Sequence, residues 1–314
     1  MSISKNSVKI AAFLVITLLW AACQKEASNQ LVESQNNALQ ERLSGVVPDD
    51  SLMLSKVPLI MSADYLANGQ DPSVNPGVSL TTRANPKNTL STTVIENSLV
   101  LPASFKLTMP PVMNQGGEGS CVSFALIYAR SFEKYNRSNA TTYSISTNIL
   151  SPEFIFNQVK SDAYCTGSSL LTSLDLLVNK GVCTWATMPY TSAGCTILPN
   201  SNQLTEAVNN KIVSYSQILK TDQVAIKTMI ASKRALVSSI TIDDNFRKAG
   251  IGYIWKSFST NPRRHALAIC GYDDSKHAYL AVNAWGTTFG DAGYIWIDYD
   301  FLPTVSSGLY VMNF

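Results

Sequence analysis

The sequence predicts an α+β protein in which helices and strands are segregated along the chain. Residues from about 115 to 212 carry apolar positions at helical spacing, and residues from about 213 to 300 are rich in strand-forming, aromatic and glycine residues. This segregation is typical of the α+β class. At 314 residues and 34.2 kDa, the chain is long enough for a substantial hydrophobic core or for two lobes.

The composition excludes several classes of protein. Hydrophobic residues make up 46% of the chain and charged residues 15%, so disorder throughout the chain is excluded. A net charge of +2 provides no electrostatic footprint for nucleic acid, and we expect no nucleic-acid partner. Six cysteines are too few for a disulfide scaffold. Only two histidines are present, His265 and His277, so a mechanism that needs an imidazole has two candidates.

Residues 1–22 are predicted to be a signal peptide. Two lysines precede an apolar run from Ile10 to Ala22, which is short for a membrane span and suits the hydrophobic region of a signal. The run ends in small residues followed by Cys23, which resembles the lipobox of bacterial lipoproteins. We therefore expect an exported protein whose lipidated Cys23 holds it at the outer membrane or cell surface. An ordinary secretory signal is the alternative.

Residues 24–99 are predicted to be a low-complexity tether or a propeptide. They are rich in Ser, Asn, Thr, Gln and Pro, and no sustained helical or strand periodicity runs through them. A stretch of this composition cannot bury enough apolar surface to fold alone. Because no helical inhibitory pattern is recognisable in it, we expect a stalk, with the folded domain comprising residues 100–314.

A glycine-rich loop ending in Gly119-Ser120-Cys121 leads into a predicted helix. Apolar and aromatic residues recur at helical spacing after the loop, and Ser120 can cap the helix. Cys121 then lies in the first turn, where unpaired N–H groups and the positive end of the helix dipole stabilise a thiolate. A cysteine at this position is a candidate nucleophile, and a small buried core residue is the alternative.

A predicted hairpin brings the first histidine close to an amide side chain. His265 opens an apolar strand that continues to Tyr272, and Asn283 ends a second strand, with Asp273-Asp274 in the turn between them. Neighbouring strands can place His265 and Asn283 side by side. In that arrangement the amide holds one imidazole tautomer while the other ring nitrogen faces a thiol.

The order and spacing of these motifs resemble those of papain-family cysteine peptidases. Gln115 lies six positions before Cys121, and His265 lies 144 positions after it, within the roughly 130–150 residues typical of that family. Asn283-Ala284-Trp285-Gly286 is similar to the family's Asn-Ser-Trp-Gly segment. The resemblance covers residues 100–314. It implies a papain-like two-lobed fold, with a helical lobe, an antiparallel β-barrel-like lobe and the active-site cleft between them.

The resemblance also implies an activity, the hydrolysis of protein peptide bonds by a cysteine-type endopeptidase through a covalent thioester. The implied roles are Cys121 as nucleophile, His265 as acid and base, Asn283 orienting His265, Gln115 in the oxyanion hole, Trp285 shielding the site, and Gly167 and Ser168 binding extended substrate. We expect polypeptide substrates, a monomer, no cofactor and no metal.

Two positions depart from the family's nucleophile motif. Glu118 stands where the family usually has a cysteine, and Val122 stands where it has tryptophan, which puts substrate preference in doubt. The usual partner of the missing cysteine corresponds to Cys165, so the family's disulfide near the site cannot form in its usual way. One bridge among Cys165, Cys183 and Cys195 is expected, with Cys165 to Cys195 favoured, while Cys270 is expected as a buried thiol inside a strand.

The changed loop leaves a second function open. A catalytically silent papain-like lipoprotein that binds peptides or proteins would keep the scaffold without the chemistry. The chain retains Gln115, Cys121, His265 and Asn283 together. This combination argues for the enzyme, because a binding module has no need of an oriented base. The remaining charged candidates, namely His277 and the pairs Asp243-Asp244 and Asp273-Asp274, are expected in exposed turns.

Overall fold

The computed structural model describes residues 46–47, 49, 56–57, 59–60, 79–83 and 96–314. The predicted signal peptide, Cys23 and most of the 24–99 segment lie outside the described residues. No helix in the described part of the chain is both long enough and apolar enough to span a membrane.

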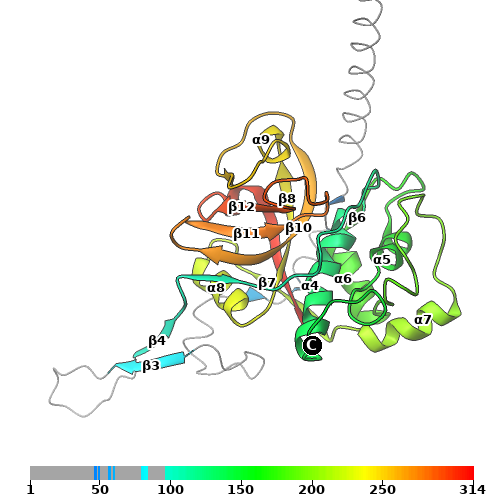
Figure 1. Cartoon of the computed structure of the whole chain (residues 1–314), viewed down its shortest axis with the longest axis horizontal. Coiled ribbons are helices and arrows are strands. Elements are labelled where there is room, and N and C mark those ends of the chain that lie inside the picture. The colour runs from blue at the N-terminus through cyan, green and yellow to red at the C-terminus, as the bar shows by residue number, and fades with distance from the viewer. Residues whose placement is uncertain (1–45, 48, 50–55, 58, 61–78, 84–95) are drawn as a thin grey trace, which may run out of the picture. The chain divides into compact units, whose positions relative to one another are not determined.

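Helices follow one another through the first part of the folded domain (Figure 1). They are α4 (Cys121–Arg137), α5 (Pro152–Val159), α6 (Leu170–Asn179) and α7 (Ser201–Ala207), followed by the 3-10 turn η1 (Val208–Asn210). The Ser169 side chain accepts a hydrogen bond from the Thr172 amide and caps α6, which ends just before Gly181. Gly181 adopts a φ of +79°, as residues that end helices commonly do. The predicted helix from 169 to 180 is confirmed.

The second part is a largely antiparallel sheet of nine strands among the described residues. Its order is β2 (Leu59–Ile60), β7 (Ser214–Ile218), β13 (Ser306–Asn313), β8 (Leu236–Ile242), β10 (Arg263–Asp273), β11 (Ala278–Val282), β12 (Tyr294–Asp298) and β9 (Ile254–Trp255), with β5 (Ser104–Lys106) also paired to β10. Three short helices accompany it: α8 (Gln223–Ala231), α9 (Asp244–Arg247) and α10 (Leu302–Val305). The predicted α+β, two-lobed fold is thus confirmed.

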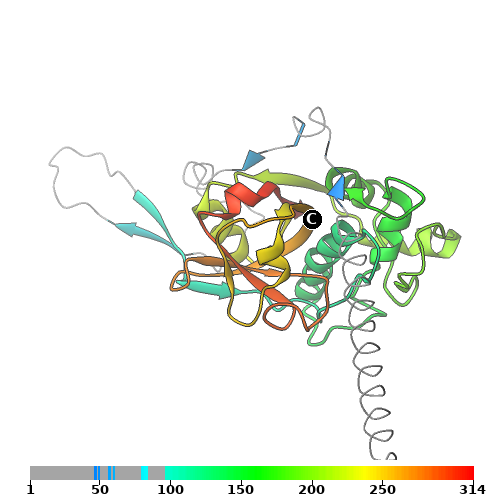
Figure 2. The same ribbon diagram turned by 90° about the horizontal axis from the view of Figure 1, so that it is seen from above.

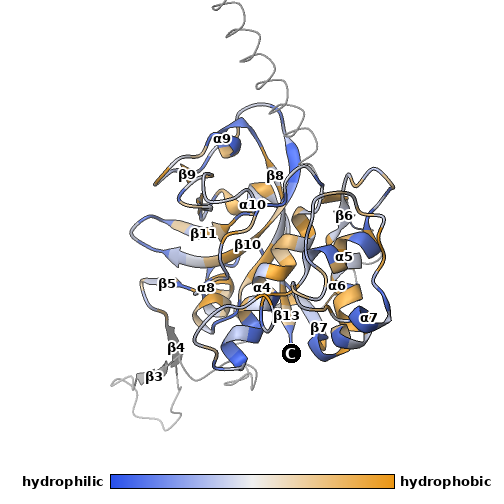
Figure 3. Ribbon diagram, turned by 45° about the vertical axis from the view of Figure 1, so that its right-hand side comes forward, coloured by the Kyte–Doolittle hydropathy of each residue, from blue (hydrophilic) through white to orange (hydrophobic). Residues whose placement is uncertain are grey.

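Helix α4 is the element that both parts share. It packs against α5 and α6 of the helical part and against β8 and β10 of the sheet. Its residues are buried on all sides from Cys121 to Glu133, and Figure 3 shows apolar residues along it. A helix buried all round lies inside a core rather than on a surface, so the start of α4 is held from both directions.

The hairpin predicted from the sequence is confirmed, with one irregularity. Ala268 pairs with Val282 and Asp273 pairs with Ala278, and the register shifts between Ile269 and Gly271. The extra residue in this β-bulge is Cys270, which is fully buried. The bulge follows the part of β10 that contains His265. That part, from Arg263 to Ile269, is also paired to β8.

The structure differs from the expected stalk at two places in the 24–99 segment. Val46–Val47 form strand β1, which pairs in parallel with β6 (Ser168–Ser169), and Leu59–Ile60 pair in parallel with β7. Both short strands are blue in Figure 2. A third pair, β3 (Ser79–Arg83) and β4 (Glu96–Val100), is antiparallel. Strands of two residues leave no periodic pattern, which is why the sequence did not predict them.

Tyr128 of α4 links the helix to two segments of the site. Its hydroxyl accepts a hydrogen bond from the Met113 amide at 2.6 Å and donates one to the Asn283 carbonyl at 3.3 Å, and the side chain is fully buried. The substitution Tyr128→Phe leaves the partly buried Met113 amide without its acceptor. We expect it to lower the free energy of unfolding by about 1–3 kcal/mol.

Chemical denaturation of both proteins measures this difference. Tyr135→Phe is the matched control, because Tyr135 lies on the same helix, is only half-buried and stacks on Tyr143. Its loss should stay below about 0.5 kcal/mol. Equal losses for the two substitutions would contradict the role given to the Tyr128 hydroxyl.

Candidate active site

Cys121 is the first residue of α4 and has no exposed surface. The unpaired N–H groups of the first turn and the helix dipole favour negative charge on a side chain at this position. The predicted cap is wrong, however. The Ser120 hydroxyl makes no capping bond and lies instead 2.8 Å from the Tyr190 hydroxyl.

His265 and Asn283 are joined by a buried hydrogen bond. The Nε2 atom of His265 lies 2.8 Å from Oδ1 of Asn283, and the same Oδ1 accepts the Ala284 amide hydrogen at 2.8 Å. Because the Ala284 amide can only donate, this oxygen must be the acceptor, so His265 must donate from Nε2. In the neutral ring Nδ1 then carries no proton. That buried nitrogen has no hydrogen-bond partner among the described residues and is the one left to act as a base.

Aromatic rings surround the His265 imidazole. The Trp285 ring centroid lies 4.8 Å from that of His265, the Phe246 centroid lies 5.9 Å from it, and Phe289 packs on Trp285 at 5.0 Å. Burial in these surroundings lowers the pKa of His265 to about 4, against the opposing effect of the Asn283 hydrogen bond. Trp285 therefore lies where the sequence placed it, beside the histidine it was expected to shield.

The loop before the nucleophile is paired with the segment that contains Asn283. The Gln115 amide donates to the Ala284 carbonyl at 2.9 Å, and the Gly286 amide donates to the Met113 carbonyl at 3.0 Å. Side-chain Nε2 of Gln115, which is fully buried, donates to the Glu118 carbonyl at 2.8 Å. A primary amide has two N–H donors, so one remains for an oxyanion.

The edge predicted to bind substrate is next to this loop. The Gly119 amide donates to the Cys165 carbonyl at 2.9 Å, and a Cβ atom on Gly119 would lie 2.1 Å from the Thr166 carbonyl oxygen. Only glycine permits this approach. The nucleophile loop therefore rests directly on the chain that leads into Gly167 and Ser168.

That edge is occupied by the chain itself. Val46 pairs with Ser168 and Val47 with Ser169, while an isolated bridge from Lys160 covers the opposite side of Ser168. The Asp49 carboxylate accepts hydrogen bonds from the Ser169 hydroxyl and, at 3.0 Å, from the Leu171 amide. Val46, Val47 and Asp49 thus contact the strand to which an extended substrate was expected to pair.

The structure locates the cysteines and the two residues, Glu118 and Val122, that differ from the family's nucleophile motif. Cys165 and Cys195 form a disulfide with their Cα atoms 5.7 Å apart, whereas Cys183 and Cys270 are buried thiols outside it. Val122 has no exposed surface. The Glu118 side chain is buried, and its Oε1 accepts the Gly194 amide hydrogen at 2.7 Å.

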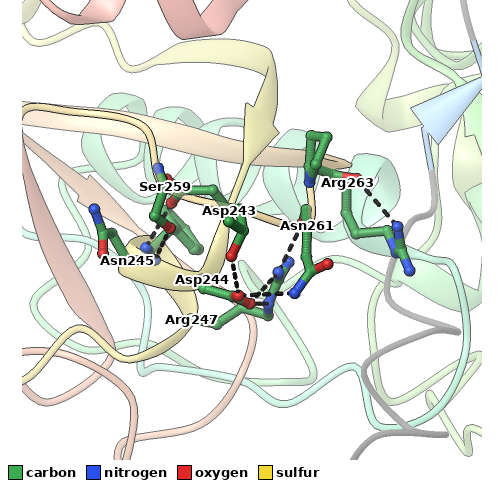
Figure 4. A network of polar contacts seen from close by, with 10 residues as sticks. Asp243, Asp244, Asn245, Arg247, Ser259, Asn261 and Arg263 are labelled. Carbon is green, nitrogen blue, oxygen red and sulfur yellow. Dashed lines mark hydrogen bonds and ion pairs between the residues drawn. The ribbon is translucent and has the colours of Figure 1, made fainter.

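Of the acidic pairs expected on the surface, Asp243 is buried. Its carboxylate accepts hydrogen bonds from the Phe246 amide at 2.9 Å and from the Ser259 amide, and it caps α9. Figure 4 shows this network, in which Asp244 contacts Arg247 and Asn261. The cap holds the turn that carries Phe246 against His265. An aspartate just before a short helix is a sequence signal for this role, and our sequence reasoning missed it.

The other charged candidates are near the surface, as expected. His277 is exposed and lies 3.0 Å from Asp300, Asp274 is exposed and pairs with Lys227, and Asp273 binds Lys276 at the surface. None of these side chains contacts the His265 site through a described bond. The imidazole of the candidate site is therefore His265.

Comparison with known proteins assigns the family. The profile of the papain family cysteine proteases matches residues 103–304. An uncharacterized peptidase C1-like protein of Acanthamoeba polyphaga mimivirus is 25% identical over 213 residues, covering 62% of this chain and 68% of the viral protein. Zingipain-2 of Zingiber officinale is 27% identical over 188 residues, covering 59% of this chain and 80% of zingipain-2.

Solved structures show the same fold. Xylellain, a cysteine protease from Xylella fastidiosa, superposes with a TM-score of 0.66 at 20% identity, over 87% of this chain and 96% of xylellain. A Carica candamarcensis cysteine protease in complex with E-64 superposes with a TM-score of 0.54 at 21% identity, over 68% of this chain and 99% of that protein. With the family profile matching most of its folded part, the chain belongs to the papain family of cysteine proteases.

Proposed function

We propose that the chain cleaves peptide bonds within polypeptides through Cys121, His265 and Asn283. The observation that carries this proposal is the chain of hydrogen bonds from the Ala284 amide through Asn283 to His265, because it leaves Nδ1 as the basic nitrogen. A base fixed in one tautomer beside a helix that starts with cysteine suits nucleophilic catalysis. A binding module gains nothing from such an arrangement, which disfavours the silent scaffold.

In the proposed reaction the Cys121 thiol gives its proton to Nδ1 of His265, the resulting thiolate attacks the peptide carbonyl carbon, and the C=O π electrons move to oxygen. The remaining Gln115 N–H and the Cys121 amide stabilise that oxyanion. The C–N bond then breaks as protonated His265 donates its proton to the leaving amine, which gives a thioester. Water attacks the thioester carbonyl while neutral His265 accepts its proton, and release of the acid restores the Cys121 sulfur.

The proposed base, His265, must take up a proton during the reaction, although burial disfavours its protonated, charged form. The fully buried imidazole has a lowered pKa, and the helix dipole at Cys121 favours the opposite charge next to it. A thiolate and an imidazolium therefore stabilise each other only as a pair. Removing the sulfur should leave His265 neutral down to low pH.

Export of the protein to an oxidising compartment is part of the proposal. The Cys165–Cys195 disulfide supports it, since such bonds persist outside the cytosol. Attachment through lipidated Cys23 stays a prediction from the sequence. Endopeptidase action is supported by the position of β1, because an internal segment of a polypeptide, Val46–Val47, lies along the expected substrate edge.

The first prediction concerns the oxyanion donor. Gln115→Ala should lower kcat about 10²–10³-fold with KM nearly unchanged, because the donor acts on charge that develops only in the transition state.

Cys121→Ala should abolish hydrolysis of a fluorogenic peptide. Iodoacetamide and E-64 should label Cys121 selectively near pH 6, and His265→Ala should remove that selectivity. Sluggish, uniform labelling of all cysteines would favour the silent scaffold.

The second prediction concerns stability against pH. In Cys121→Ala, His265 has a folded pKa of about 4 and an unfolded pKa of about 6.5, so the unfolded chain binds more protons between these values. The free energy of unfolding should therefore fall by about 2 kcal/mol from pH 7 to pH 4.5 through this group. Adding His265→Gln should remove that part of the slope in urea titrations. Identical slopes with and without His265 would contradict the assigned burial effect.

The third prediction concerns Val46, Val47 and Asp49. We propose that they block the substrate edge, because β1 pairs with it and Cys121 has no exposed surface in this state. A hollow of about 220 Å³ beside them is lined by Arg264 and by Ile240, the cross-strand partner of His265. Burial of a valine is worth roughly 1.5–3 kcal/mol, so Val46→Lys in the full chain should raise the initial kcat/KM about tenfold.

Leu59→Lys is the matched control for this experiment. Leu59 lies in the same part of the sequence, is 48% exposed and belongs to a strand that pairs with β7 instead of β6. Its rate should equal that of the unmodified chain. A Val46→Lys rate no higher than the control's would show that the segment does not block the edge.

A further inference from the structure

Glu118 is a buried carboxylate that the proposed mechanism does not use. It lies three residues before Cys121 and its side chain is only 6% exposed. Burying a carboxylate costs free energy unless hydrogen bonds compensate it. Its Oε1 accepts the Gly194 amide hydrogen at 2.7 Å, and its Oε2 lies 3.2 Å from the Tyr190 hydroxyl. Both partners belong to one segment, residues 190–195.

These contacts close a ring around the nucleophile loop. The Gly119 amide donates to the Cys165 carbonyl at 2.9 Å, and Cys165 is bonded to Cys195 through the disulfide. Gly194, the residue before Cys195, returns to the loop through the Glu118 carboxylate. The ring therefore has one covalent link and two hydrogen bonds. Without the carboxylate, the disulfide still joins residues 165 and 195, but the bond between Gly194 and the loop is lost and only Tyr190 of segment 190–195 still contacts the loop.

Tyr190 extends the ring to the oxyanion donor. Its hydroxyl donates to the Gln115 carbonyl at 2.6 Å and lies 2.8 Å from the Ser120 hydroxyl. Burial raises the pKa of Tyr190, so the phenol stays protonated and able to donate. Gln115 is held from its other end too, since its Nε2 donates to the Glu118 carbonyl. Three residues of the loop, Gln115, Glu118 and Ser120, thus contact one phenol.

We propose that Glu118 is a positioning residue whose carboxylate anchors the nucleophile loop to segment 190–195 and so fixes the Gln115 amide for the oxyanion. The proposal rests on the proposed peptidase activity. It assigns a use to the residue that departs from the family's nucleophile motif. Because the effect passes through Gln115, loss of the carboxylate should weaken stabilisation of the transition state and leave attack on small alkylating reagents intact.

The test uses the full chain with two substitutions of Glu118. Glu118→Leu keeps similar volume and removes both acceptors, while Glu118→Gln keeps an oxygen for Gly194 and an amide for Tyr190. We expect Glu118→Leu to lower kcat about 10–100-fold with KM within about threefold, and Glu118→Gln to lower kcat by less than about fivefold. Alkylation of Cys121 by iodoacetamide should stay within about threefold in both variants.

Two further measurements separate positioning from a general loss of structure. In a Gln115→Ala background, Glu118→Leu should lower kcat by less than about threefold, because both substitutions remove the same stabilisation. Hydrogen exchange should become at least about tenfold faster at the Gln115 and Gly119 amides in Glu118→Leu. Neither amide binds the carboxylate directly; they donate to Ala284 and Cys165.

Glu153→Gln is the matched control. Glu153 is also a buried carboxylate, lies on α5 and accepts the Thr191 amide hydrogen of segment 190–195 at 3.3 Å, but it makes no described hydrogen bond to the nucleophile loop. Its kcat and the exchange at Gln115 should match those of the unmodified chain. Matching kcat losses in Glu118→Leu and Glu153→Gln would overturn the proposal.

Three other outcomes would also overturn it: unchanged kcat in Glu118→Leu, full additivity with Gln115→Ala, or unchanged exchange at Gln115 and Gly119. The exchange measurement does not depend on catalysis. A full chain with no hydrolytic activity therefore contradicts the proposed function, while the exchange rates still decide whether Glu118 holds the loop.

Discussion

The main-chain pairing between residues 113–115 and residues 284–286 is the interaction on which the site depends. The proposed nucleophile, Cys121, begins helix α4, which packs against both the helical part and the sheet, whereas the proposed base, His265, lies on strand β10 of the sheet. The amides of Gln115 and Gly286 donate to carbonyls on the opposite segment, and Asn114 and Trp285 form a bridge between these bonds. Main-chain bonds of this kind set the separation of the two segments regardless of side-chain rotamers, and catalysis is sensitive to errors of about 1 Å.

Burial of the polar groups gives these bonds much of their effect. Cys121, His265, Asn283 and Gln115 have no exposed surface. In such surroundings a hydrogen bond is electrostatically stronger than in water, and an unmade one costs more. The same burial suppresses charge on His265. Burial therefore favours a neutral resting imidazole, and in the proposed mechanism the helix start at Cys121 supplies the field that favours the thiolate.

Sequence reasoning succeeded where structure is local and failed where it depends on distant partners. The helix that starts at Cys121 and the hairpin from His265 follow from apolar periodicity and turn residues, which act over a few positions. Ser120 was predicted to cap because serine often does, but Tyr190, 70 residues away, supplies a competing partner. The buried role of Asp243 depends on Ser259, and the pairing of Val46 depends on Ser168. No pattern near these residues specifies such partners.

The distribution of the site over two parts separates binding from proton transfer. The loop from Gln115 to Cys121 rests on residues 165–168 through the Gly119 contact, which ties the proposed nucleophile to the expected substrate edge, and it is also bonded to residues 284–286. His265 lies in strand β10 of the sheet, and Asn283 directly follows strand β11. A small movement between the two parts would change the approach of Nδ1 to the sulfur while the substrate strand keeps its distance from the sulfur. Substitutions in the pairing between residues 113–115 and 284–286 should therefore act mainly on the chemical step. Substitutions around β6 should act mainly on substrate binding. The difference follows from the position of each contact and not from its strength.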